Sequence, residues 1–342
     1  MNGLALQYFA VQGQTTDNFP TEIRDFYDRV ALKKAVPLIT FRKWGQKRAL
    51  PKNKGKVIRF KRWGTLVPAT TPLQEGVTPV GNKMDYVEIT ATVQQYGDYI
   101  PVTDQVLMTS IDPFLTEASE QLGEQEGETH DILMRNDLLS GSNVLYASNV
   151  DGRVNVVAKV STTDLDVAIR TLKLANARRI TKQVNPTANY NTAPIRAGYI
   201  AVIHPYQSND VESLTGFVPI ENYPSSVGVM DGEIGSYKGI RFIETTQAMC
   251  YEGGGGAVAN TIKNTGGQAD VYPMLIFAED AYGEVPLSGM NHGIIIKIHG
   301  ENDRYDTSDP LNQRGSCGWK SMWVGKILND AWMVRYECAV SA

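Results

Sequence analysis

The sequence predicts an α+β fold, in which helices and strands are grouped along the chain and do not alternate regularly. Three observations carry this prediction. Helical spacing of apolar residues is concentrated before residue 180, a strict alternation of two residues marks a ribbon at 56–97, and the chain beyond residue 198 consists mainly of strands. A doubly wound sheet would require strands and helices to follow one another in turn.

Length and composition indicate a globular chain with a substantial core. The 342 residues suggest about two domains, and a hydrophobic content of 42% with 20% charged residues is ordinary for such a protein. The start, MNGLALQYFAVQGQ, has no basic region, and no run reaches the roughly 18 apolar residues of a membrane span. We therefore expect neither a signal peptide nor a membrane segment.

Charge is distributed unevenly along the chain. The segment 24–62 holds 14 Lys and Arg against Asp25 and Asp28, which gives it a net charge of +12. Since the whole chain carries −4, the remainder must carry −16. Such a separation of charge usually reflects a partner, and two remain open: nucleic acid, or an acidic surface on another copy of the chain.

The first elements expected are a short helix and a two-stranded ribbon. Apolar residues at helical spacing predict an amphipathic helix at 21–35. In the ribbon, KVIRFKRWG at 56–64 pairs by pattern with YVEITATVQQYG at 86–97, and the link between them is rich in Thr, Pro and Gly. A two-stranded ribbon is marginally stable alone in water. We expect a neighbouring subunit to cover its apolar face, formed by Val87, Ile89, Ala91 and Val93.

A long polar helix should follow at 112–140. Asp112 and Pro113 form a typical start, and Ser140 with Gly141 forms a typical end. From Glu117 to Asp137 the sequence has seven acids and one base, a net charge of −6. This acidic helix is the counterpart of the basic segment 24–62.

The rest of the chain predicts one more helix and a series of strands. Leu165, Ala168, Ile169 and Leu172 share the inward face of a helix at 162–179. Strands then follow to the C-terminal region, where Asn329 and Asp330 suggest a turn before a last strand. We interpret this end as a closing hairpin, preceded by a polar glycine-containing loop at 309–320.

No pattern of residues indicates an enzyme. Phosphate-binding, nucleophile-elbow, zinc-protease and calcium-loop motifs are absent from the sequence. The four His are scattered, and the three Cys are widely spaced without a CxxC pair, which favours free, buried thiols over a disulfide or zinc site. We expect no catalytic residue, no cofactor and no bound metal.

Five stretches in sequence resemble the major capsid proteins of tailed bacteriophages. Each is short, but together they span most of the chain in the order typical of that family. They are PLQEGVTP at 72–79, QYGDYIPVTDQ at 95–105, GEIGSYKGIRFIET at 232–245, VYPMLIFAEDAYGEVPL at 271–287 and DPLNQRGSCGWKSMWVGKILNDAWMVR at 309–335.

The resemblance implies the Hong Kong phage capsid fold. Under that expectation the chain divides into an N-terminal arm at 1–52, an extended loop at 53–103, a peripheral domain at 104–197 with the spine helix 112–140, an axial domain at 198–304, and a return to the peripheral domain at 305–342.

The resemblance also implies a function. Subunits would associate as hexamers and pentamers into an icosahedral shell around double-stranded DNA, with a scaffolding protein, a portal and decoration proteins as further partners. The protein would be found in the virion, and in the host cytoplasm during assembly. In that family the extended loop of one subunit lies across the spine helix of its neighbour. We therefore expect contacts between subunits from Arg59, Lys61, Arg62, Trp63, Val87, Ile89, Val93, Glu120, Glu124 and Glu128.

Two alternatives remain at the level of sequence. A nanocompartment shell of the same fold would enclose protein in place of DNA. A DNA-binding protein that used the basic arm directly would show steep salt dependence of its affinity, but would leave the apolar ribbon face without a purpose.

Overall fold

The computed structural model describes residues 40–79, 81–109, 114–181, 197–223, 229–287, 294–297 and 313–342. The predicted helix at 21–35, the start of the spine helix and most of the N-terminal arm lie outside these ranges. By its internal contacts the chain forms two compact units. Unit 1 comprises 1–44, 95–136 and 289–322, and unit 2 comprises 45–94, 137–288 and 323–342.

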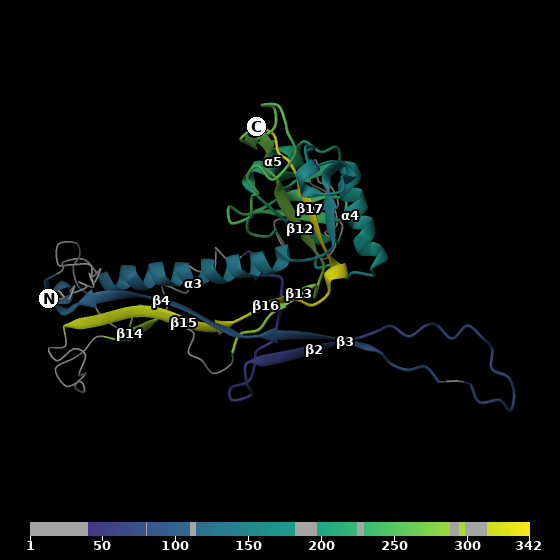
Figure 1. The fold of residues 1–342 in the computed structure, drawn as a ribbon, viewed down its shortest axis with the longest axis horizontal. Helices are drawn as coiled ribbons and strands as arrows, with labels where there is room; N and C mark the ends of the chain where they lie inside the picture. Colours follow the sequence, from purple (N-terminus) through teal and green to yellow (C-terminus); the bar gives the residue numbers. More distant parts are fainter. Residues whose placement is uncertain are drawn as a thin grey trace, which may run out of the picture. The chain divides into compact units, whose positions relative to one another are not determined.

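Unit 1 is a three-stranded sheet covered by a long helix (Figure 1). The strands lie in the order β14 (Ile295–Lys297), β15 (Arg314–Trp323) and β4 (Gln94–Thr103). Helix α2 (Asp104–Thr109) follows β4, and α3 spans Phe114–Leu139. The end of α3 at Leu139 confirms the predicted stop before Ser140 and Gly141.

Helix α3 packs on the sheet of unit 1 through a narrow buried stripe. Because only this stripe is buried, a long helix of mostly polar composition can still pack on the sheet. Leu122 packs with Cys317 and Trp319 of β15. The indole Nε1 of Trp319 donates to Oε1 of Gln125 at 2.9 Å, and His130 Nε2 lies 2.6 Å from the Ser321 hydroxyl. The buried polar groups of this stripe are thus paired with one another.

Two glycines allow strands β4 and β15 to approach closely. A Cβ on Gly97 would lie 2.6 Å from the carbonyl oxygen of Trp319, and a Cβ on Gly318 would lie 2.6 Å from the Cβ of Tyr99. Both distances are shorter than van der Waals contact allows. The prediction of a polar loop at 309–320 is therefore wrong from residue 314 onward, because its glycines serve a strand contact.

Unit 2 is built around a seven-stranded mixed sheet. Its order is β5 (Val144–Tyr146), β17 (Met333–Cys338), β12 (Tyr272–Phe277), β6 (Tyr199–Ile203), β9 (Ile240–Glu244), β8 (Glu233–Tyr237) and β7 (Phe217–Pro219). Strand β12 runs antiparallel to β17 and β6, whereas β6 and β9 are parallel, as are β17 and β5. Helices and strands do not alternate regularly along the described chain, which confirms the predicted α+β class.

The remaining elements of unit 2 are short. Strands β1 (Gln46–Lys47), β13 (Tyr282–Glu284) and β16 (Gly325–Ile327) form a second sheet, and β10 (Asn264–Thr265) pairs with β11 (Gln268–Ala269). Helix α5 spans Pro205–Glu212. Four single turns of 3-10 helix lie at Ala147–Asn149, Arg153–Asn155, Ile220–Asn222 and Asp330–Trp332.

Helix α4 (Thr162–Leu174) covers part of the sheet, as its spacing predicts. Its four predicted inward residues are all buried, and they pack in one cluster with Val334 and Tyr336 of β17. The Tyr336 hydroxyl donates to Asp164 Oδ2 at 3.0 Å. The Ser161 side chain accepts from the Asp164 amide and so caps the helix.

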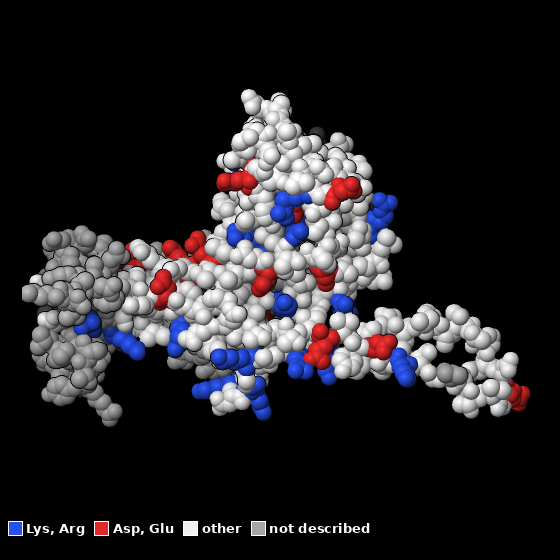
Figure 2. Space-filling model, in the orientation of Figure 1, with Lys and Arg blue, Asp and Glu red and all other residues white. Residues whose placement is uncertain are grey.

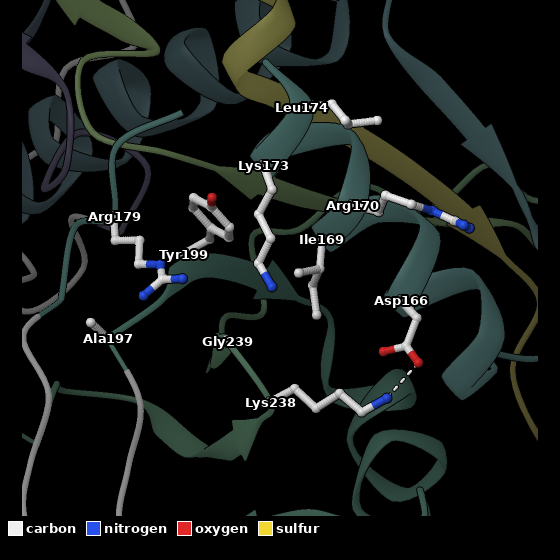
Figure 3. A pocket seen from close by; sticks show the side chains of 10 residues that line it. All are labelled: Asp166, Ile169, Arg170, Lys173, Leu174, Arg179, Ala197, Tyr199, Lys238 and Gly239. Atoms are coloured by element: carbon white, nitrogen blue, oxygen red, sulfur yellow. Dashed lines mark hydrogen bonds and ion pairs between the residues drawn. The ribbon is translucent and has the colours of Figure 1, made fainter. Parts of the chain in front are cut away.

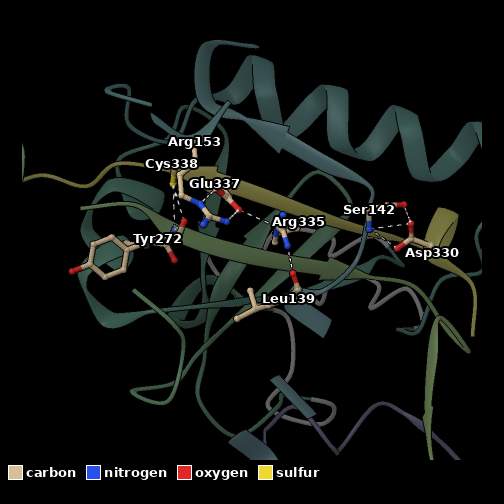
Figure 4. A network of polar contacts seen from close by, with 9 residues as sticks. Leu139, Ser142, Arg153, Tyr272, Asp330, Arg335, Glu337 and Cys338 are labelled. Atoms are coloured by element: carbon tan, nitrogen blue, oxygen red, sulfur yellow. Dashed lines mark hydrogen bonds and ion pairs between the residues drawn. The ribbon is translucent and has the colours of Figure 1, made fainter. Parts of the chain in front are cut away.

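A buried polar network joins the end of α3 to β17 (Figure 4). Glu337 is fully buried and accepts two hydrogen bonds from Arg153, at 2.7 and 2.8 Å. It also forms an ion pair with Arg335 at 3.0 Å. The Arg335 guanidinium in turn donates to the Leu139 carbonyl, which would otherwise lack a partner at the helix end.

The closing hairpin predicted from sequence is wrong. Strand β17 pairs with β12 and β5, and β16 pairs with β13, so neither forms a hairpin with β15. Asn329 and Asp330 instead begin the short turn Asp330–Trp332. The local turn signal is real, but it specifies no partner for the strand that follows.

Candidate intersubunit interface

The ribbon consists of β2 (Val57–Trp63) and β3 (Tyr86–Thr92), paired antiparallel as predicted. Val57 lies opposite Thr92, and Trp63 lies opposite Tyr86. One further hydrogen bond, from the Gly64 amide to the Asp85 carbonyl at 2.8 Å, follows before pairing stops. Residues 64–79 and 81–85, which connect the two strands, form no strand.

One ribbon face combines charge with aromatic rings. Arg59 forms an ion pair with Glu88 across the strands at 3.0 Å, and the Lys61 amine lies 4.9 Å from the ring centroid of Tyr86. Trp63 meets Tyr86 edge to face at 5.4 Å between ring centroids. These contacts are exposed, so each contributes little to the stability of the subunit.

The opposite ribbon face is apolar towards the base and charged towards the loop. Its cross-strand pairs are Ile58 with Ala91, Phe60 with Ile89, and Arg62 with Val87. Exposure rises along this face, from 1% at Ala91 to 51% at Val87. The ribbon therefore becomes progressively uncovered as it leaves its base.

Large apolar side chains are concentrated on the ribbon and the loop that joins its strands. Fifteen such side chains are exposed among the described residues, and nine of them fall between 57 and 87. Exposed apolar side chains that are concentrated in one segment of a chain favour a binding surface there. The nine are Val57, Trp63, Leu66, Val67, Leu73, Val77, Met84, Tyr86 and Val87.

The acidic residues of α3 form a second surface. Glu120, Glu124 and Glu128 recur every fourth residue and so lie along one stripe of the helix. Glu120 and Glu124 are half-buried, whereas Glu128 is exposed. Acidic side chains gather along the part of the surface formed by α3 in Figure 2.

Asp131, on the same helix, holds the chain segment that precedes the ribbon. Its Oδ1 accepts hydrogen bonds from the backbone amides of Thr40, Phe41 and Arg42, at 3.1, 2.8 and 3.2 Å. Burial raises the pKa of Asp131 to about 6, although the three amides oppose this rise. Asp131 therefore fixes residues 40–42 against α3.

The structure modifies the predicted set of contact residues in two respects. Arg62 lies on the ribbon face opposite to Arg59 and Lys61, because adjacent residues of a strand alternate, and it donates to the Leu328 carbonyl at 3.4 Å. Val93 is only 2% exposed within the subunit, so it is not available to a neighbour.

Sequence reasoning missed the apolar residues of the connecting loop. Leu66, Val67, Leu73 and Val77 have no regular spacing, so no periodicity marks them. A usable signal was nevertheless present. Large apolar residues in a loop rich in Thr and Pro have no core of their own to join, which indicates an external partner.

Other kinds of site find no support in the described part of the chain. No three His, Cys, Asp or Glu side chains there are grouped so that they could hold a metal ion. No helix in that part is long and apolar enough to cross a membrane. Cys250, Cys317 and Cys338 are free, and Cys317 and Cys338 are buried.

A sequence comparison identifies a related family. The family model described as "Phage capsid protein" matches residues 86–306, which is well over half of the chain. The match includes β3, β4, α3 and most strands of the large sheet. No curated protein matches the sequence.

Solved structures show the same fold at low sequence identity. The capsid of Ralstonia phage GP4 aligns with a TM-score of 0.64 at 10% identity, covering 100% of this chain and 99% of that one. The head structure of Helicobacter pylori bacteriophage KHP40 gives 0.59 at 11% identity, covering 99% of each. The capsid of Cyanophage P-SCSP1u gives 0.57 at 16% identity, covering 99% and 94%. The predicted tailed-phage major capsid fold is confirmed.

Proposed function

Because this chain belongs to the phage capsid protein family, we propose that it assembles as hexamers and pentamers into an icosahedral shell that encloses double-stranded DNA. The observation that carries the proposal is the ribbon, whose apolar side chains remain exposed in the single subunit. A capsid shell protein has a use for such a surface, since neighbouring copies can bury it.

The energy of assembly should come mainly from burial of that apolar surface. Each Å² of apolar area removed from water contributes about 25 cal/mol. Trp63 and Tyr86 already touch and present a paired aromatic surface. Aromatic residues of this kind often dominate the binding energy of an interface.

Charge should affect the register of the contact between subunits and the rate of their association more than the affinity of the contact. The positive charge of the ribbon complements the negative charge of α3. We therefore expect Arg59 and Lys61 of one subunit to approach the α3 glutamates of the next, which are Glu120, Glu124 and Glu128. Arg59 already has an ion-pair partner in Glu88, so contact with a neighbour would share or exchange that partner. Such exposed pairs contribute about 0 to 1 kcal/mol each.

Further partners follow from the same proposal. A scaffolding protein would guide assembly, a portal would occupy one vertex, and decoration proteins would bind the finished shell. The chain would reside in the virion after assembly in the host cytoplasm.

The test reverses charge on α3. We expect the double variant Glu120→Lys and Glu124→Lys to remain folded by circular dichroism but to form no closed shells in negative-stain electron microscopy, with scaffolding protein co-expressed. The matched control, Glu221→Lys with Glu279→Lys, makes the same charge change on exposed acids of unit 2. It should assemble normally.

Three results would count against the proposal. Normal shells from the α3 variant would exclude the charge pairing. Failure of the wild-type chain to form shells under every condition would exclude the shell itself. Shells that contain protein and no DNA would favour a nanocompartment.

A further inference from the structure

A groove rich in Lys and Arg lies beside helix α4 in unit 2. Its first part is a hollow of about 450 Å³ between α4, the start of β6 and the turn between β8 and β9. Four cationic side chains line it, against the single carboxylate of Asp166. The four are Arg170, Lys173, Arg179 and Lys238.

The cationic groups converge from separate segments of the chain. Lys173 and Arg179 reach into the hollow from the end of α4 and the segment after it (Figure 3). Lys238 reaches in from the β8–β9 turn and pairs with Asp166. The hollow is therefore a point where the fold brings positive charge together, and not merely a charged run of sequence.

The position of Lys238 suggests that its charge is needed there. Lys238 has a φ of +49°, and Gly239 follows it in the two-residue turn between β8 and β9. This left-handed conformation favours Asn, Asp or Gly, and a lysine adopts it at some cost. A residue that strains the backbone is a pointer to function when its side chain also reaches a candidate site.

The groove continues past the first hollow. A second hollow of about 640 Å³ shares Asp166, Arg170 and Lys238 with the first. It adds the hydroxyl-bearing residues Thr162, Thr163 and Thr215. Arg170 extends away from Lys173 and Arg179 in Figure 3, so cationic groups follow one another along the groove.

We propose that this groove binds the phosphodiester backbone of DNA, an inference that rests on the proposed function. Arg, Lys and Thr side chains are typical donors to phosphate oxygens. An extended track of cations fits a ligand with repeated negative charges better than one carboxylate or one free anion. Of the described residues that line it, Asp166 alone is acidic, and its charge is balanced by Lys238. Binding should be independent of DNA sequence.

The test measures DNA binding by full-length subunits, held at concentrations too low for assembly. Fluorescence anisotropy with two short duplexes of unrelated sequence gives the affinity at several salt concentrations. Lys173→Gln with Arg179→Gln should weaken binding about tenfold to a hundredfold and reduce the slope of log K against log[salt] by about 1.8, since each phosphate contact contributes about 0.9. Lys238→Asn should also weaken binding. Asn readily adopts the left-handed conformation of this turn, so the substitution removes the charge without straining the backbone.

A matched control separates the groove from general charge. Lys52→Gln with Lys54→Gln removes the same charge from exposed residues of the basic segment before the ribbon. Unchanged affinity in this control, with loss in the groove variant, supports the proposal. Equal loss in both, or loss in the control alone, overturns it.

Electron microscopy of the same variants distinguishes the two proposals. Shells from the groove variant, with reduced DNA affinity, support both. A groove variant that binds DNA normally but fails to assemble would show that the groove contacts another copy of the chain, which overturns the inference. Absence of shells from the wild-type chain would remove the proposed function, whereas the DNA titration would still report on the groove.

Discussion

The seven-stranded sheet and the ribbon β2–β3 both consist of regular strands, yet they differ in what covers them. Every residue of β6 and β12 is buried within the subunit. In the ribbon, Ala91 is the only buried residue of the two strands. The sheet is thus covered by its own chain, whereas most of the ribbon is left exposed by the single subunit, and we propose that a neighbouring subunit covers it.

The largest effect should come from the polar network within the sheet. Glu337→Gln removes the charge that two arginines share, and breaking a buried ion pair costs about 3 to 5 kcal/mol. Glu88→Gln makes the same change in the exposed ribbon pair, where the expected cost is at most about 1 kcal/mol. Urea denaturation of dissociated subunits gives both values. Equal losses would contradict the contrast between the two regions.

An intermediate effect is expected at Asp131, which is buried but retains hydrogen bonds. Its pKa of about 6 lies above the ordinary value, so the folded chain binds more protons than the unfolded chain between about pH 4 and pH 6. Its contribution to stability therefore falls as pH rises through this window.

The matching measurement compares the wild type with Asp131→Asn. The free energy of unfolding of the wild type, relative to the variant, should fall by about 2 kcal/mol from about pH 4 to about pH 6. A difference that stays constant with pH would mean that Asp131 keeps an ordinary pKa in the folded subunit.

The smallest effect on the subunit should come from the loop of the ribbon. Val67 and Val154 are both largely exposed, at 79% and 70%. Changing either to Ser should alter the stability of the isolated subunit by less than about 0.5 kcal/mol. Only Val67→Ser should raise the subunit concentration required for shell formation, measured by light scattering. If Val154→Ser has the same effect, exposure on the ribbon has no special role.

Elements with a strong local period could be predicted from sequence. The alternation of Ile58 and Phe60 against Ile89 and Ala91 predicts the ribbon, and the spacing from Leu165 to Leu172 predicts the buried face of α4. In both cases one face of the element is buried or partly buried, so the spacing of apolar residues in the sequence identifies that face directly.

Pairing between distant strands could not be predicted in the same way. The strand containing Val334 and Tyr336 is evident from its alternation, but its partners Met274 and Leu145 lie far away in the sequence. Likewise, Lys173, Arg179 and Lys238 line one hollow only because the fold brings the end of α4 and the β8–β9 turn to the same place. Neither arrangement leaves a local signal.

The place of β17 has a consequence for the synthesis of the protein. This strand lies between β5 and β12 in the sheet, yet it follows all other strands of that sheet in the sequence. The ribosome must therefore synthesise the chain up to residue 338 before all seven strands of the sheet can pair. A nascent chain released earlier would lack an interior strand. Translation errors that truncate the chain before this point should give subunits that cannot enter a shell. Only chains that contain the complete strand β17 would thus be incorporated into a shell.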